Sequence, residues 1–349
     1  MFILDRILQK QGFILADGAT GTNYFQLGLE TGYPPELWSL EKPEHVSGLH
    51  QRFIEAGSDV ILTNTFGGTT HRLKLHQAED QVRTLNIAAA RLARECADNY
   101  HAATGREIAV AGSIGPTGEL FTPLGMLTHD AAVAAFTEQA EALAEGGVDM
   151  LWIETISAFE EVFAALEAAK KTGLPVAATM TFDTAGKSMM GVDPADFAKQ
   201  ISEKGVVAVG ANCGIGPAEL MHSVTAMHPA DGVMRIAKGN CGIPEYVEGK
   251  IHYHGTPELM AKYAVLARDA GVQIIGGCCG TSPDHIRAMR QALDQAIDGD
   301  RPAVDAARLE SELGKPWKNI PEQPSSASTA STPCTATTAA LLLFLAGTV

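Results

Sequence analysis

The sequence predicts an α/β fold of the (β/α)8 type, a TIM barrel. Eight short, almost continuously apolar segments alternate with longer segments of helical periodicity over about 290 residues, the scale of one such barrel. Continuous apolar segments are typical of parallel strands that helices cover on both faces. An open, doubly wound sheet is the alternative, because periodicity does not show whether a sheet closes on itself.

The predicted strands are short and rich in Val, Ile, Leu and Ala. In chain order they are Phe13–Asp17, Asp59–Asn64, Glu107–Ser113, Val148–Glu154, Pro175–Phe182, Val206–Asn212, Gly232–Lys238 and Val272–Gly277.

One predicted helix follows each strand. The helices are Pro43–Ala56, Gln81–Asn99, Asp130–Glu145, Phe159–Lys171, Pro194–Lys204, Pro217–Met227, Pro257–Ala270 and Pro283–Ile297. Asp193, Thr256 and Ser282 each stand directly before a proline, which is the order of a capping residue and the first helical position.

The composition is that of a globular, acidic protein. Its 349 residues are 46% hydrophobic and carry a formal net charge of −15, which argues against a nucleic-acid partner. Six cysteines are too few for a disulfide-stapled secreted fold, and Asp5, Arg6 and Lys10 interrupt the apolar start that a signal peptide would need. No apolar segment is long enough to span a membrane, so we expect a cytoplasmic protein, with a homo-oligomer possible.

The carboxyl-terminal region departs from this globular pattern. We predict a barrel over residues 1–300 and an extension over 301–349, disordered from about residue 322 because QPSSASTASTPCTATT at 323–338 is a low-complexity segment. The apolar AALLLFLA at 339–346 is too short to cross a bilayer.

Four of the six cysteines follow predicted strand ends, where a barrel carries its functional residues: Cys213, Cys241, Cys278 and Cys279. Cys278 and Cys279 are adjacent and flanked by glycines, and Cys213 follows the sixth strand. Three thiolates suit Zn²⁺ and leave a fourth tetrahedral position open for a substrate. The residues alone also allow apolar packing, a vicinal disulfide, or Cys241 as the third ligand.

Four motifs carry a family resemblance: DGATGT at 17–22, NTFGG at 64–68, ANCG at 211–214 and GGCCGT at 276–281. Together they resemble the zinc-dependent homocysteine S-methyltransferases over about residues 10–296. The resemblance implies the barrel independently of the strand pattern, and Zn²⁺ held by Cys213, Cys278 and Cys279. It also implies that the substrate thiol loses its proton on binding and becomes the nucleophile, so that no catalytic base beyond the zinc site is needed.

The charged groups of homocysteine need partners of opposite charge or hydrogen-bond donors. Glu154 and Asp17, both at strand ends, are the candidates for the ammonium group, and the resemblance favours Glu154. A salt bridge for Glu154 and a turn-capping role for Asp17 are the alternatives. The backbone N–H groups of the loop from Ser113 to Gly115 are expected to bind the carboxylate.

Three further residues are expected at the substrate site. Gly18 and Asn64 belong to the first two motifs. Asn240 matches the asparagine that, in relatives resembling methionine synthase, occupies the fourth zinc position when substrate is absent; a plain turn residue is the alternative.

The methyl donor is the least constrained part of the prediction. A single barrel favours a small activated donor, and DGATGTNYFQLGLETG, NTFGGTTHRLKLH, TFDTAGKSMMG and KGNCGIPE resemble bacterial betaine–homocysteine S-methyltransferases most. S-methylmethionine, or a corrinoid protein acting in trans, is the alternative donor. A non-enzymatic zinc-binding or thiol redox-sensing barrel is the alternative from another class.

A trimethylammonium donor is best held by an aromatic cage. The aromatic candidates near strand ends and loops are Tyr24, Phe25, Trp38, Phe66, Phe121 and Phe182. Animal betaine enzymes have a tyrosine after the Thr-Phe of the second strand, where this chain has Gly67, so that cage position is not reproduced.

Overall fold

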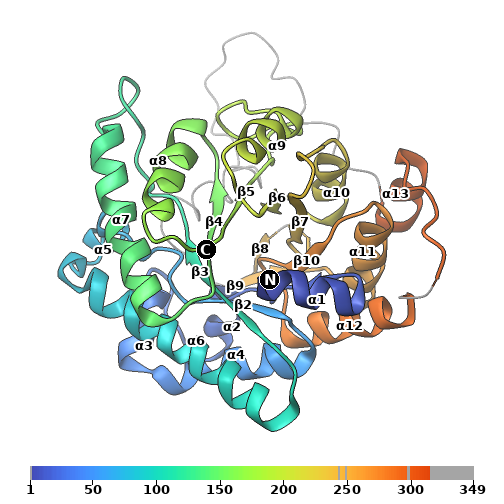
Figure 1. The fold of residues 1–349 in the computed structure, drawn as a ribbon, viewed down its shortest axis with the longest axis horizontal. Coiled ribbons are helices and arrows are strands. Elements are labelled where there is room, and N and C mark those ends of the chain that lie inside the picture. Colours follow the sequence, from blue (N-terminus) through green and yellow to red (C-terminus); the bar gives the residue numbers. More distant parts are fainter. Residues whose placement is uncertain (1, 243, 248–249, 297–298, 315–349) are drawn as a thin grey trace.

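The computed structural model describes residues 2–242, 244–247, 250–296 and 299–314. Eight parallel strands form one sheet surrounded by helices (Figure 1). In their spatial order the strands are β1 (Ile14–Leu15), β10 (Ile274–Gly277), β7 (Met234–Gly239), β6 (Ala208–Cys213), β5 (Val176–Met180), β4 (Met150–Ile156), β3 (Ala109–Ile114) and β2 (Val60–Leu62).

The two ends of this strand order also meet. Ala16 forms a parallel bridge with Val60. The Asp59 N–H donates to the Leu15 carbonyl at 2.6 Å, and the Asp17 N–H donates to the Val60 carbonyl at 3.0 Å. The sheet therefore closes on itself, which confirms the predicted TIM barrel and makes the open-sheet alternative wrong.

All eight predicted helices are present, with bounds within a few residues of those expected. They are α4 (Pro43–Ala56), α6 (Val82–Thr104), α7 (His129–Gly146), α8 (Phe159–Lys170), α9 (Pro194–Ser202), α10 (Pro217–Thr225), α11 (Pro257–Asp269) and α12 (Pro283–Ala296). The Asp193 and Thr256 side chains accept from Ala195 N and Leu259 N, so these two predicted caps are confirmed.

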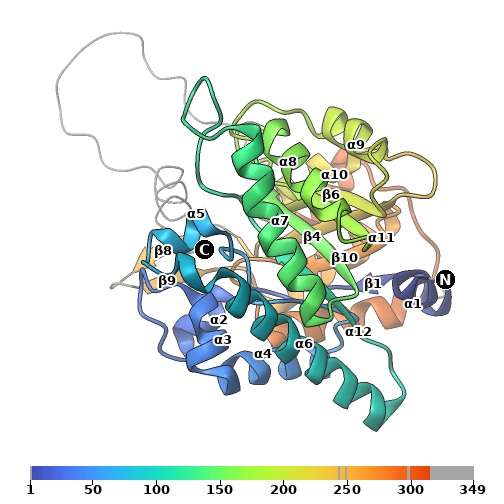
Figure 2. The ribbon, with the colours of Figure 1, turned by 60° about the vertical axis from the view of Figure 1, so that its left-hand side comes forward.

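Several shorter elements were not predicted, because each spans fewer than ten residues. They are α1 (Ile3–Gln11), α2 (Gly21–Gln26), the 3-10 turns η1 (Pro35–Leu37) and η2 (Glu79–Gln81), α3 (Trp38–Glu41), α5 (Thr70–Lys74), the antiparallel hairpin of β8 (Pro244–Val247) with β9 (Lys250–Tyr253), and α13 (Ala306–Leu313). Figure 2 shows α1 and the hairpin at opposite ends of the barrel.

Helix α1 closes the amino-terminal end of the barrel. Its Leu4 and Ile7 are buried and pack with residues that point into the barrel, including Ile14, Met150 and Trp152. The interior is thus a packed core at this end, and open space for a ligand is left at the other.

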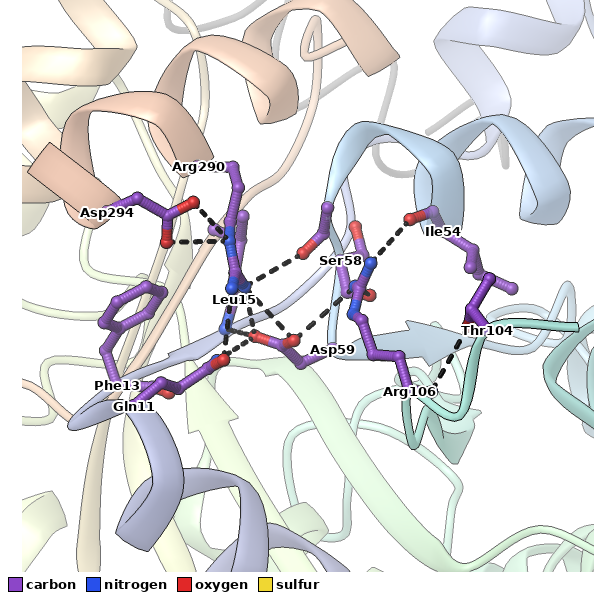
Figure 3. Close-up of polar contacts among 11 residues, drawn as sticks. Gln11, Phe13, Leu15, Ile54, Ser58, Asp59, Thr104, Arg106, Arg290 and Asp294 are labelled. Carbon is purple, nitrogen blue, oxygen red and sulfur yellow. Dashed lines mark hydrogen bonds and ion pairs between the residues drawn. The ribbon is translucent and has the colours of Figure 1, made fainter. Parts of the chain in front are cut away.

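A buried carboxylate fastens this closed end (Figure 3). Asp59, just before β2, accepts from Leu15 N at 2.9 Å and from Gln11 Nε2 at 2.7 Å. It also pairs with Arg290 of α12 at 3.2 Å and with Arg106 at 3.5 Å. Burial raises the pKa of Asp59 while the two guanidinium groups oppose the rise. One side chain thereby links α1, β1, α12 and the segment before β3.

His50 in α4 predicts a pH dependence of stability. It is buried, its Nε2 has no hydrogen-bond partner among the described residues, and burial lowers its pKa to about 4. The unfolded chain therefore binds a proton between pH 6.5 and 4 that the folded chain excludes, so stability falls as pH falls. From pH 7 to 4.5 this group should cost about 2.5 kcal/mol. Urea unfolding of the wild type and His50→Leu should show the difference; equal losses of stability in both would contradict it.

The described part of the predicted extension packs on the barrel. Leu309 of α13 is buried, and Arg308 pairs with the buried Asp269 of α11 at 2.7 Å. The predicted boundary at residue 300 stays a prediction, and the low-complexity and apolar segments at 323–338 and 339–346 lie outside the described residues. Within the described chain, no helix has both the length and the apolar character needed to cross a bilayer.

Candidate metal centre and substrate cavity

A cavity lies at the carboxyl ends of the barrel strands, with about 680 Å³ of empty space including its open mouth. Residues from several strand ends and the loops after them line it. They include Gly18, Thr20, Thr22, Glu36, Asn64, Phe66, Ser113, Glu154, Thr155, Cys213, Lys238, Cys278 and Cys279. In TIM barrels this end carries the active site, so the cavity is the candidate functional site.

The sulfur atoms of Cys213, Cys278 and Cys279 converge in this cavity. All three lie within 4.8 Å of one another, and the Cys213 and Cys279 sulfurs are 3.9 Å apart. Cys241 is buried nearby, but its thiol donates to the Gly255 carbonyl at 3.6 Å and it is not part of the group. Three converging thiol sulfurs are a ligand set that suits a thiophilic ion such as Zn²⁺.

The backbone turns sharply to present Cys213. Cys213 and Gly214 have φ values of +63° and +80°, both in the left-handed region, so the chain bends away as β6 ends. Asn240 braces this bend: its Nδ2 donates to the Gly214 carbonyl at 2.5 Å, and its Oδ1 accepts from Cys279 N at 2.9 Å. One side chain thus ties together the two loops that carry the cysteines.

Asn212, the residue directly before Cys213 in β6, also supports the site. Its amide accepts from Thr155 N at 2.8 Å, donates to Thr155 Oγ1 at 2.7 Å, and donates weakly to the Cys278 sulfur at 3.8 Å. Thr155 has a φ of +60°, so these bonds hold a strained residue next to Glu154.

Hydrogen bonds favour a thiolate at Cys278. The Cys213 and Cys279 thiols both donate to it and lower its pKa, and Lys238 adds a favourable charge. The hydrogen bonds to Cys278 in turn raise the pKa of the Cys213 and Cys279 thiols. A soft anionic sulfur with two neighbouring thiols fits a metal ion that replaces the shared protons.

Three buried charged groups lie beside the cysteines. The ammonium of Lys238, at the end of β7, is 3.4 Å from Asp17 Oδ1. Asp17 Oδ2 accepts from Leu62 N at 2.8 Å. Glu154 accepts from the Ser113 hydroxyl at 2.6 Å and more weakly from Asn212 at 3.5 Å. Asp17 thus pairs with Lys238 instead of capping its turn, and no ion pair of the described residues includes Glu154.

The environment moves the pKa values of these groups. Burial raises the pKa of Asp17 to about 6 and that of Glu154 to about 7, although Lys238 opposes both rises. Burial alone would lower the pKa of Lys238, but the charges of Asp17, Cys278 and Glu154 raise it above its usual value. The lysine is therefore cationic. Glu154 lines the cavity and is suited to bind a second cation, whereas Asp17 lies behind Lys238 as its buried partner.

One sequence-based expectation fails at the third strand. The Ser113 N–H donates to Thr63 Oγ1 at 3.0 Å, and the Gly115 N–H donates to the Phe66 carbonyl at 3.0 Å. Neither group is free for a substrate carboxylate. Lys238 is the only cationic side chain among the described residues that line the cavity.

Gly18 and Asn64 line the cavity but have local structural roles. A Cβ on Gly18 would lie 2.7 Å from Thr281 Oγ1, so the two strand ends approach too closely for a side chain. Asn64 Nδ2 donates to the Pro35 carbonyl at 2.7 Å and to Ser39 Oγ at 3.1 Å. It thereby fastens η1 to the rim of the cavity.

The aromatic cage expected from the sequence does not assemble in the described residues. Of the six candidates only Phe66 lines the cavity. Tyr24 and Trp38 are buried and pack on each other with ring centroids 5.1 Å apart. Phe182 lines a separate small cavity on the far side of Cys213.

Sequence reasoning gave no role to four residues of this site: Lys238, Asn212, Glu36 and Tyr253. Lys238 and Asn212 stand at predicted strand ends, so their position marked them but their partners did not. Glu36 and Tyr253 come from η1 and the hairpin, which carry no such signal. Tyr253 occupies the space where a side chain of residue 280 would lie, so the hairpin covers the turn that carries Cys278 and Cys279.

The fold and the site together define a TIM barrel with three converging thiols and three buried charged groups at the carboxyl ends of its strands. The profile of the homocysteine S-methyltransferase family matches residues 14–293. The chain belongs to this family.

Individual relatives agree with this assignment. The chain is 29% identical over 315 residues to a methionine synthase of Mycobacterium leprae (strain TN); the match covers 86% of this chain and 26% of that protein, so the chain spans about a quarter of its relative's length. The oxidised form of the homocysteine methyltransferase MmuM from Escherichia coli superposes with a TM-score of 0.71 at 25% identity, over 83% of this chain and 99% of that one. Its metallated form superposes with a TM-score of 0.69 at 24% identity, over the same shares.

Proposed function

We propose that the protein transfers a methyl group from betaine to homocysteine and forms methionine and dimethylglycine. The observation that carries the acceptor half is the convergence of three thiol sulfurs beside buried Asp17, Glu154 and Lys238. The donor half is supported by the resemblance of the sequence motifs to bacterial betaine enzymes.

The donor set of the site fits zinc. Cys213, Cys278 and Cys279 would hold the ion, Asn240 and Asn212 would keep the cysteine loops in place, and a bound Zn²⁺ would lower the pKa of a thiol at its open position. The metallated form of the Escherichia coli relative supports a metal here. Because free thiols are needed, a reducing compartment such as the cytoplasm is part of the proposal.

The protein's own residues orient the substrates. The carboxylate of Glu154 binds the homocysteine ammonium, and Lys238 binds its carboxylate, with Asp17 as the buried partner that positions Lys238. The new bond joins the homocysteine sulfur to the methyl carbon. The bond from that carbon to the betaine nitrogen breaks, and its electron pair stays on nitrogen. Because its ammonium and carboxylate are bound, homocysteine holds its sulfur in line with the methyl group. This positioning is the protein's remaining contribution to the rate.

A panel of methyl donors tests the proposal. Zinc-loaded protein with homocysteine should form methionine and dimethylglycine from betaine. Turnover with S-methylmethionine or a methylated corrinoid protein but not with betaine would replace the donor and keep the acceptor half. No methyl transfer from any donor, together with a reversible Cys278–Cys279 disulfide, would favour the redox-sensing alternative instead.

A further inference from the structure

A carboxylate outside the Asp17–Lys238–Glu154 group also lines the cavity. Glu36 belongs to η1, is only 5% exposed, and shares the cavity wall with the three cysteines. The bond from Asn64 to the Pro35 carbonyl anchors η1 to the end of β2. The Glu36 carboxylate is therefore held in a fixed place, and its charge has no role in the acceptor half of the reaction.

The surroundings of Glu36 leave its charge incompletely matched. Its Oε1 accepts from Gly67 N at 2.6 Å. Arg72 opposes the rise that burial causes in the pKa of Glu36. None of the ion pairs among the described residues includes Glu36. A buried carboxylate without an ion-pair partner is unfavourable unless a cation approaches it.

Gly67 is what allows the carboxylate to stand there. A Cβ on residue 67 would lie 2.7 Å from Glu36 Oε1 and 3.5 Å from Oε2. A side chain at position 67 and the observed carboxylate therefore exclude each other. Since Phe66 is the only one of the six cage candidates that lines the cavity, the wall offers a charge where an aromatic cage would offer several rings.

We propose that Glu36 recognises the positive charge of the methyl donor, with Phe66 as its apolar neighbour. A quaternary ammonium or sulfonium group donates no hydrogen bond, so charge and apolar contact are the interactions that can select it. This inference rests on the proposed function in one respect, because it takes the donor to be a small onium compound.

The charge of the donor disappears as its methyl group leaves. A carboxylate beside it therefore stabilises the bound donor more than the transition state, and Glu36 contributes to donor affinity and selectivity without increasing kcat.

Glu36→Gln is the test, because glutamine keeps an oxygen acceptor for Gly67 and removes the charge. The dissociation constant of betaine, from calorimetry, and its KM should rise at least about tenfold. The value of kcat should not fall, and the KM for homocysteine should not rise. Inhibition by 3,3-dimethylbutyrate, in which carbon replaces the betaine nitrogen, should be unchanged or stronger, since that analogue carries no positive charge.

Glu161→Gln is the matched control. Glu161 is also buried and also interacts with Arg72, but it accepts from Thr117 and does not line the cavity. It should leave betaine binding unchanged. Gly67→Ala provides a second variant that displaces the carboxylate without removing it, and it should weaken betaine binding as Glu36→Gln does.

The possible results separate this inference from the proposed function. If the wild type uses betaine but Glu36→Gln binds it as tightly as before, the role of Glu36 is refuted and the proposed reaction stands. If the wild type uses only S-methylmethionine and Glu36→Gln binds that donor as tightly as before, the role of Glu36 is refuted and only the acceptor half of the proposed reaction stands. An equal loss of affinity for betaine and for 3,3-dimethylbutyrate, which lacks the positive charge, would also refute a charge-based role. If the wild type uses neither onium donor, both proposals fall together.

Discussion

Replacement of Cys278 by serine should remove both the metal and the methyl transfer. The Cys278 sulfur is one of three that lie within 4.8 Å of one another, and hydrogen bonds with the two other thiols lower its pKa. A serine hydroxyl stays protonated and is a poor ligand for a thiophilic ion. We expect about one zinc per wild-type chain and almost none in the variant. The rate of methionine formation should fall more than about 100-fold. Loss of a residue that only hydrogen-bonds to a metal ligand lowers activity by about 10- to 100-fold, so loss of a ligand itself should lower it further.

Cys241→Ser is the control for this prediction. Cys241 is a buried thiol close in sequence and space to the site, but its partner is the Gly255 carbonyl. Metal analysis and activity should be unaffected by its loss. If Cys241→Ser loses zinc and Cys278→Ser keeps it, the ligand assignment is wrong.

Replacement of Glu154 by glutamine should have the second largest effect. Glutamine still accepts from the Ser113 hydroxyl, so the strand ends keep their contact. The substrate ammonium loses a charged partner, and Lys238 loses one of the buried charges that favour its cationic form. We expect kcat/KM for homocysteine to fall about 10- to 100-fold, the range for a hydrogen bond to a charged group.

A substrate analogue isolates the role of Glu154. 4-Mercaptobutyrate has no amino group, so its weaker reaction should be similar in the wild type and in Glu154→Gln. Equal losses for both thiols would show that the variant damages the site generally.

The pKa of Glu154, about 7, predicts a difference in pH dependence between the wild type and Glu154→Gln. Burial raises the pKa of Glu154 above its usual value, so the free protein protonates this carboxyl as pH falls through 7. The wild-type kcat/KM for homocysteine should fall over that interval, and the part of the fall due to Glu154 should be missing in Glu154→Gln.

Much of the barrel was readable from local patterns. The apolar strands and the helices that begin after Asp193 and Thr256 have nearly the predicted bounds, because parallel strands and capped helices leave strong signals in neighbouring residues. Closure had no such signal. It depends on β1, a strand of two residues, meeting β2 through Ala16 and Val60.

The candidate site divides in the same way. Adjacent Cys278 and Cys279, and Cys213 at a strand end, were recognisable because strand ends of a barrel meet on one face. Three other features depend on which groups lie within hydrogen-bonding distance in the folded chain. They are the bonds of Asn240 to both cysteine loops, the pairing of Asp17 with Lys238, and the hydrogen bonds already made by the Ser113 and Gly115 N–H groups.

By itself the sequence determined the fold class, the strand ends that carry the chemistry, and the cysteines able to hold a metal. These follow from periodicity and residue type, which act over a few neighbouring positions. Only the tertiary structure decided which charges and hydrogen-bond donors remain for the substrates. Glu36 and Gly67 are 31 residues apart in sequence and are joined by one hydrogen bond, and no local pattern specifies such a contact.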